Sequence, residues 1–186
     1  MFQLYLANGP EGSKGKGKGG KLQEARVGSD REMGLKQFTS ISELLSKLKM
    51  DLHLSYHSFL KEFISEPNDG VTLLLDLLKV IQLSQTNIAG VHSSLDSKLH
   101  QSVFKKALAD EHECLLCLKL CVEAEDGSMR LADHPSGLFT ISVCVMSNFS
   151  KSRVLALQLL TKMCSVGRGH KQVNAIKVGI LVHHWK

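Results

Sequence analysis

Apolar residues recur at three- and four-residue spacing through most of this chain, from residue 39 onward. The first stripe consists of Ile41, Leu44, Leu45, Leu48 and Leu52, which share one face of a helix because an α-helix has about 3.6 residues per turn. No convincing alternation of apolar and polar residues, as a strand would show, interrupts this pattern. The spacing predicts an all-α fold, with helices over about 41–52, 56–65, 71–85, 98–124, 128–133, 138–146 and 154–163 and another beginning near His170.

Turn-forming residues separate these segments. Residues 66–70 (EPNDG) and 134–137 (HPSG) are turn clusters, and residues 86–97 are expected to form a polar loop. At the start of the first helix, Ser40 can act as the N-cap, with Glu43 at capping-box spacing. Gly127 is expected to end the long helix by taking the left-handed conformation.

One pattern recurs within the chain. Gly70 is followed by Val71, Leu74, Leu75 and Leu78, and Gly137 is followed by Leu138, Ile141 and Val145 at matching offsets. Short helices that follow one another with such an echo are typical of helical solenoids, in which each unit packs on the next. The sequence therefore favours an all-α helical solenoid.

The first 37 residues have a different composition. Lys14, Lys16, Lys18 and Lys21 alternate with glycines and contribute to a net charge of +5. Such a segment buries too little apolar surface to offset its chain entropy, so residues 1–37 are expected to be a disordered basic tail. Aromatic residues make up only 5% of the chain, which disfavours nucleic-acid binding by base stacking. Attraction of the tail to an acidic lipid surface stays open as an alternative.

The five cysteines, Cys114, Cys117, Cys121, Cys144 and Cys164, all lie inside apolar segments. Buried thiols in a reducing compartment are therefore expected, and disulfides are not. His112, Cys114 and Cys117 suggest a zinc site, but no second ligand pair stands at suitable spacing. A thiol nucleophile would need an exposed, electropositive surrounding. We expect a binding module with no cofactor and no metal, and not an enzyme.

Three stretches, in order, resemble a known family. The first runs from Leu48 through residues 59–63 (FLKEF) to Gly70 and Leu78, the second is residues 113–119 (ECLLCLK) followed by Gly127, and the third comprises residues 134–137, 151–164 and Gly169-His170. Together they resemble the GTPase-binding and armadillo region of diaphanous-related formins over about residues 40–176. The Gly-His ending favours the formin-like and Daam-type branches, and Phe59 stands where the family usually has Trp.

This resemblance implies an armadillo-like solenoid over residues 38–176, with residues 177–186 as a tail outside the family pattern. It implies two partners. A small Rho-family GTPase would contact Lys49, His53, Leu54 and Ser55. The C-terminal autoregulatory helix of a formin would lie in a groove formed by Lys119, Glu123, Leu159, Lys162 and Ser165.

In the family, GTPase binding displaces the autoregulatory helix and so controls actin filament assembly. The resemblance implies a cytoplasmic, cytoskeleton-associated protein that acts on actin only indirectly, and a truncated relative of the family. Two alternatives remain: a generic armadillo-like scaffold with other partners, and a thiol or zinc protein.

Overall fold

The computed structural model describes residues 40–54, 57–90, 97–167 and 169–174, and in these ranges every regular element is a helix. In chain order the helices are α2 (Ile41–Leu54), α3 (His57–Ile64), α4 (Gly70–Gly90), α5 (Ser97–Cys121), α6 (Glu125–Asp133), α7 (Gly137–Val143), the short 3₁₀ helix η2 (Cys144–Met146) and α8 (Ser150–Cys164). Residues 169–174 are also helical. The all-α prediction is confirmed for this part of the chain.

The first described helix, α2, begins where the sequence predicts. Its N-terminus is capped by Ser40, whose Oγ accepts a hydrogen bond of 3.2 Å from the backbone N–H of Glu43. Leu45, Leu48 and Leu52 are buried, as the apolar stripe requires. This face of α2 packs against α5.

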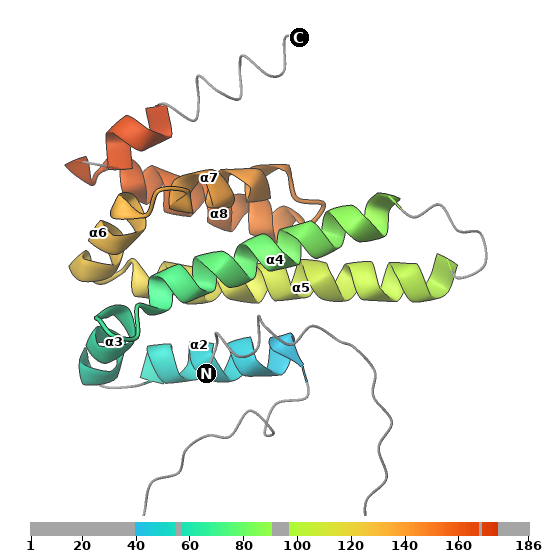
Figure 1. Cartoon of the computed structure of the whole chain (residues 1–186), viewed down its shortest axis with the longest axis horizontal. Coiled ribbons are helices and arrows are strands. Elements are labelled where there is room, and N and C mark those ends of the chain that lie inside the picture. The colour runs from blue at the N-terminus through green and yellow to red at the C-terminus, as the bar shows by residue number, and fades with distance from the viewer. Residues whose placement is uncertain (1–39, 55–56, 91–96, 168, 175–186) are drawn as a thin grey trace, which may run out of the picture. The chain divides into compact units, whose positions relative to one another are not determined.

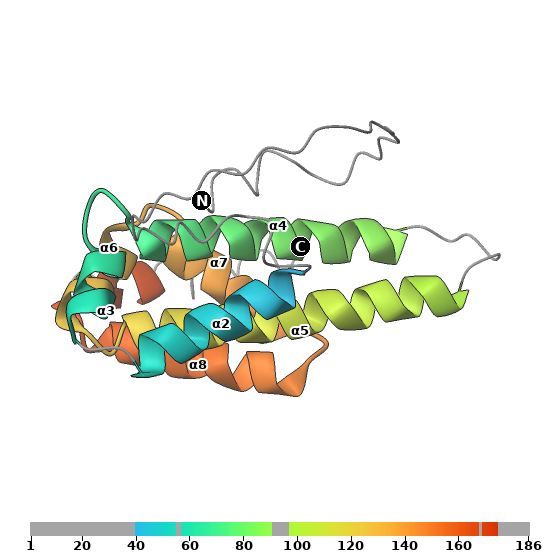
Figure 2. The ribbon, with the colours of Figure 1, turned by 90° about the horizontal axis from the view of Figure 1, so that it is seen from below.

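Two helical triplets follow α2, and they repeat one arrangement. The first triplet is α3, α4 and α5, and the second is α6, α7 and α8. Each helix of the first triplet packs against its counterpart in the second: α3 against α6, α4 against α7 and α5 against α8. Figure 1 shows the two triplets stacked, and Figure 2 shows α2, α5 and α8 side by side in one layer. This stacking is that of an armadillo-like helical solenoid, so the predicted fold class is confirmed.

The echo seen in the sequence is the start of the middle helix in each triplet. Gly70 begins α4 and Gly137 begins α7. The apolar residues that follow them are buried: Val71, Leu74, Leu75 and Leu78 in α4, and Leu138 and Ile141 in α7. The repeat in sequence is therefore a repeat in structure.

The predicted loop at residues 86–97 is wrong at its start, while its predicted end agrees with the start of α5 to within one residue. Helix α4 continues to Gly90 and α5 begins at Ser97, while residues 91–96 lie outside the described part of the chain. Polar residues at the end of α4 bond within the fold instead of ending the helix. Ser84 and Thr86 donate to the carbonyls of Ile81 and Leu83, and Gln85 reaches α5.

The predicted role of Gly127 is also wrong. Helix α5 ends at Cys121, before the predicted end at residue 124, and Gly127 lies inside α6. A Cβ at Gly127 would lie 2.0 Å from the carbonyl oxygen of Cys121. The glycine is therefore needed for a close approach of two helices, and not for a left-handed cap.

A buried carboxylate joins the two triplets. Glu111 in α5 is 1% exposed. Its Oε2 accepts a hydrogen bond of 3.1 Å from Nε2 of Gln85 in α4, and its Oε1 accepts one of 2.5 Å from Oγ of Ser147, between η2 and α8. Because a buried polar group without partners is costly, these bonds favour one register between the triplets.

The close approach at Gly127 can be tested by adding a methyl group. Gly127→Ala should lower the free energy of unfolding by about 1–3 kcal/mol, because its Cβ would overlap the Cys121 carbonyl. The matched control is Gly167→Ala, where a Cβ meets nothing within 4 Å. Urea unfolding followed by circular dichroism measures both variants. Equal midpoints for the two would contradict the assignment.

The bonds of Glu111 predict a second loss of stability. Glu111→Ala should cost about 3 kcal/mol, because it leaves the amide of Gln85 and the hydroxyl of Ser147 buried without their acceptor. Glu123→Ala, at an exposed carboxylate, should stay within about 0.5 kcal/mol of the unmodified protein. Thermal and urea unfolding distinguish these outcomes, and a tolerated Glu111→Ala would refute the role of the carboxylate.

Candidate partner-binding groove

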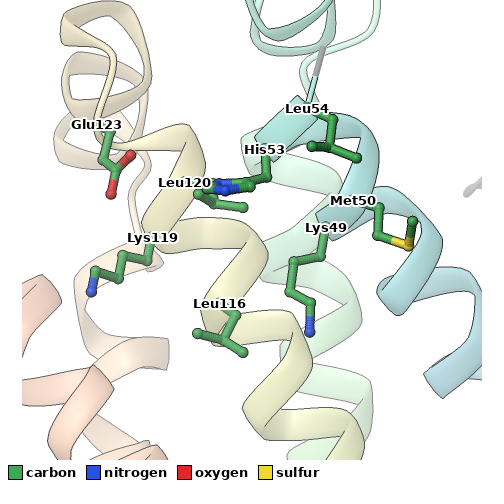
Figure 3. A pocket seen from close by; sticks show the side chains of 8 residues that line it. All are labelled: Lys49, Met50, His53, Leu54, Leu116, Lys119, Leu120 and Glu123. Atoms are coloured by element: carbon green, nitrogen blue, oxygen red, sulfur yellow. The ribbon is translucent and has the colours of Figure 1, made fainter.

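A groove of about 370 Å³ lies between α2 and α5. Figure 3 shows the side chains that line it, which are Lys49, Met50, His53 and Leu54 from α2 and Leu116, Lys119, Leu120 and Glu123 from α5. We call this surface the α2–α5 groove. It brings together side chains that lie more than 60 residues apart in the sequence.

The lining of the groove combines apolar and charged side chains, with Lys49 and His53 projecting toward Leu116 and Leu120 between the two helices (Figure 3). Met50 and Leu54 are 54% and 73% exposed, so both present apolar area to solvent beside the groove. Leu116 and Leu120 add apolar surface from α5 and are half-buried. An open surface that combines apolar and charged side chains is suited to a protein surface or an amphipathic helix.

Each of the two lysines at the groove has a polar partner on a neighbouring helix. Nζ of Lys49 lies 2.6 Å from Oε2 of Glu113, so α2 and α5 are joined by an ion pair beside the groove. Nζ of Lys119 donates to Oε1 of Gln158 in α8 over 3.4 Å. The second contact connects the groove to the surface of α8.

Along α8 the same layer carries two further hollows. One, of about 460 Å³, is lined by Val154, Leu157, Gln158, Thr161 and Lys162. The other, of about 300 Å³, lies where His112 of α5 meets Ser150, Lys151, Val154, Leu155 and Gln158. The hollows of this layer thus extend from α2 across α5 to α8.

The structure places in one groove residues that the sequence analysis assigned to two different partners. Lys49, His53 and Leu54, predicted for the GTPase, and Lys119 and Glu123, predicted for the autoregulatory helix, line one groove. Ser55 lies outside the described residues.

The remaining predicted residues belong to α8 and its C-cap. Lys162 is exposed and lines the hollow on α8, and the Ser165 hydroxyl donates to the Lys162 carbonyl over 2.6 Å. Leu159 is 1% exposed, so it supports the surface from beneath and presents no area to a partner. The sequence prediction did not include Met50, Leu116 and Leu120. Residues 114–122 are apolar except for Lys119, and a helix that is apolar on so many sides can leave some of its apolar side chains at a surface.

The buried thiols do not suit nucleophilic chemistry. Burial raises the pKa of Cys117 and of Cys144 to about 12, and it raises the pKa of Cys114 well above the ordinary range. These thiols therefore stay protonated, while the nucleophile is the thiolate. Among the described residues no group of three or more His, Cys, Asp or Glu side chains could hold a metal ion.

His112 is the titratable group at the junction of α5 and α8. Its ring meets that of Phe149 edge-on, with centroids 5.2 Å apart, and its Nδ1 is buried without a hydrogen-bond partner. Burial, with Lys151 and Lys49 nearby, lowers the pKa of His112 despite Glu113 and Glu111. Burial also lowers the pKa of His134, beside Lys79.

A helical solenoid with an open groove lined by both apolar and charged side chains has the architecture of a protein-binding module. Residues 23–165 match the family model of the Diaphanous GTPase-binding domain. The match covers well over half of the chain, and the chain belongs to this family.

Three relatives illustrate the range of similarity. Human Formin-like protein 1 is 23% identical over 169 residues, which cover 69% of this chain and 15% of the relative. Formin-D of Dictyostelium discoideum is 27% identical over 124 residues, covering 67% of this chain and 9% of the relative. Human Disheveled-associated activator of morphogenesis 2 is 24% identical over 132 residues, with 71% and 10% covered. The chain thus spans less than a fifth of the length of these relatives. No helix in the described ranges is long and apolar enough to cross a membrane.

The two histidines predict how stability depends on pH. Their pKa values lie below the ordinary value of 6.5, so the unfolded chain takes up protons more readily than the folded one. The free energy of unfolding should be highest above pH 6.5 and should fall as the pH decreases below that value. The double variant His112→Gln, His134→Gln should flatten this dependence. Urea midpoints measured between pH 7.5 and 5.5 test it, and an unchanged slope in the double variant would disprove it.

Proposed function

We propose that this chain is the GTPase-binding regulatory module of a formin, which binds a small Rho-family GTPase and a formin autoregulatory helix and so controls actin filament assembly. The observation that carries the proposal is the α2–α5 groove, in a chain that belongs to the Diaphanous GTPase-binding domain family. The expected location is cytoplasmic and associated with the cytoskeleton. Action on actin would be indirect, through the actin-assembling part of a formin.

For the GTPase, the C-terminal turns of α2 are the proposed contact. Met50 and Leu54 offer exposed apolar area, and His53 projects from the same turns toward Leu120 of α5 (Figure 3). Lys49 is fixed by Glu113, so little side-chain entropy would be lost when a partner covers it. Large apolar side chains that become buried next to fixed polar groups commonly supply most of the energy of an interface.

For the autoregulatory helix, the proposed surface runs from the α2–α5 groove to α8. An amphipathic helix would bury its apolar side on Leu116, Leu120 and Leu157. Lys162 is exposed at the far side, where its charge stays solvated and can pair with an acidic residue of the incoming helix. Lys119 and Glu123 border the path between these two regions.

The two proposed ligands would share the α2–α5 groove. His53 and Leu54 stand on one side of it, and Lys119 and Glu123 stand on the other, across a hollow of about 370 Å³. A GTPase that covers the α2 side would remove part of the surface available to the helix. Binding of each ligand would then weaken binding of the other by the same factor.

The test is binding of purified protein to Rho and Rac loaded with a GTP analogue, and separately to a peptide of a formin C-terminal autoregulatory segment. Leu54→Glu should weaken GTPase binding at least tenfold, about 1.4 kcal/mol, because it replaces exposed apolar area on the α2 side of the groove with a charge. Leu83→Glu is the matched control, since Leu83 is 62% exposed on α4 and lies outside the groove.

The nucleotide and the competition experiment decide the outcome. GTPase loaded with GDP should bind much more weakly than GTPase loaded with the GTP analogue. The GTPase loaded with the GTP analogue should also displace a labelled peptide of the autoregulatory segment. Absence of nucleotide-dependent binding together with absence of peptide binding would refute the proposal and leave a scaffold with other partners. Equal effects of Leu54→Glu and Leu83→Glu would show that binding uses a surface other than the α2–α5 groove.

A further inference from the structure

Helices α4 and α7 lie outside the layer that carries the groove, and they pack side by side (Figure 1). Nε2 of Gln82 in α4 donates to the carbonyl of Thr140 over 2.9 Å and lies 3.1 Å from Sγ of Cys144. Neighbouring positions on a helix project about 100° apart. Leu83, which follows Gln82, and Val143, which precedes Cys144, therefore point away from the contact between the two helices.

The outer side of these two helices is apolar. Phe139, Val143 and Met146 are 61%, 42% and 77% exposed, and their spacing of four and three residues places them in one ridge along α7 and η2. On α4, Leu83 is 62% exposed and Val80, one turn earlier, is 45% exposed. We call these five side chains the α4–α7 face. None of them lines the α2–α5 groove or the hollows on α8.

The α4–α7 face is also free of charge. No residue from Val80 to Gly90, and none from Pro135 to Ser150, is Asp, Glu, Lys, Arg or His. The next charges along α4 neutralise each other, since Nζ of Lys79 lies 3.1 Å from Oδ1 of Asp76. Helix α8 differs, because it has no acidic residue and carries Lys151, Arg153 and Lys162. Few charges together with exposed Phe and Met side chains are typical of the centre of a protein interface.

The distribution of charge indicates which partner fits this face. The chain has a net charge of +5, so two copies repel each other over much of their surface. They can approach with the least repulsion through a face that has no charge. In a twofold arrangement both copies present the same face, so apolar area meets apolar area and no charge is buried without a partner.

We propose that two copies of this chain associate through their α4–α7 faces, with the ridge of Phe139, Val143 and Met146 in each copy packed beside Leu83 of the other. The five side chains cover less than the roughly 800 Å² that each partner contributes to a standard interface, so the dimer is weak and reversible. A Kd of about 10–100 μM is expected. The α2–α5 groove stays open in this dimer, so the inference goes beyond the proposed function and does not depend on it.

The test is sedimentation equilibrium of the full chain between about 5 and 500 μM, a range that brackets the expected Kd. The apparent mass should rise from that of one copy to that of two. Phe139→Glu should raise the Kd at least tenfold, because it places a charge from each copy in the apolar contact. Leu54→Glu is the matched control, since Leu54 is 73% exposed in the α2–α5 groove, and it should leave the Kd unchanged.

Salt distinguishes an apolar contact from a charged one. The two copies carry the same net charge, and salt screens the repulsion between them. The Kd should therefore fall between about 50 and 500 mM sodium chloride. A Kd that rises with salt would show that ion pairs hold the copies together, and it would overturn the proposal.

Urea unfolding followed by circular dichroism shows whether each variant folds. If Phe139→Glu does not fold, Met146→Glu replaces it with the same expected increase in Kd, because Met146 is the most exposed member of the ridge. A Kd raised equally by Phe139→Glu and Leu54→Glu overturns the proposal. So does a dimer that Phe139→Glu leaves intact.

A protein that stays monomeric throughout the concentration range also overturns the proposal, and the unfolding midpoint then identifies the cover of the face. A midpoint lowered by Phe139→Glu would assign the face to another part of the same chain, and an unchanged midpoint would assign it to a different protein. Phe139→Glu should leave GTPase binding unchanged, so failure of the dimer and failure of the proposed function are distinguished by separate variants.

Discussion

One turn of α5 holds the neighbouring helices in register. Its four consecutive side chains, Asp110 to Glu113, project about 100° apart and meet different partners. The partners are Ser42 for Asp110, Gln85 and Ser147 for Glu111, the ring of Phe149 for His112, and Lys49 for Glu113. Because any slip of α2, α4 or α8 along α5 would leave buried polar atoms without partners, this turn makes other registers costly.

The same helix also supplies half of the binding surface, so stability and binding depend on one segment. Residues 114–122 are apolar almost all round, and Cys114, Cys117 and Cys121 fill the core. Leu116 and Leu120, on the remaining side, line the α2–α5 groove. The ion pair of Lys49 with Glu113 contributes to both stability and binding, because it joins α2 to α5 beside the groove. The spacing of the groove walls is therefore set by the packing of the core.

The sequence predicts the helices well because their apolar periodicity reports on burial directly. It predicts their ends less well. Gly127 permits a close approach to Cys121, and Gln85 bonds to a residue that is 26 positions away, so neither role can be inferred from neighbouring residues. For the site, the resemblance selected polar residues such as His53 and Lys119, but it also selected Leu159, which is buried. An apolar run cannot indicate which of its side chains stay open, and that depends on where α2 packs.

The repeat relates the two ends of the binding surface and explains why they differ in chemistry. Gly127 approaches the carbonyl of Cys121 at the end of α5, and Gly169 approaches that of Met163 near the end of α8, so the two triplets are related by a shift of 42 residues. Under this shift, Leu120 in the α2–α5 groove corresponds to Lys162 on α8. The surface is thus apolar over α5 and carries an exposed cation at the same position one triplet later. A helix lying across both would gain most of its burial on α5, because an unpaired lysine offers little apolar area beyond its stem. The direction in which this helix lies would be set at Lys162, because an acidic residue of the helix can pair with Lys162 in only one of the two directions. The charge at Lys162 would therefore determine the direction of docking, and the apolar contacts with α5 would supply most of the affinity.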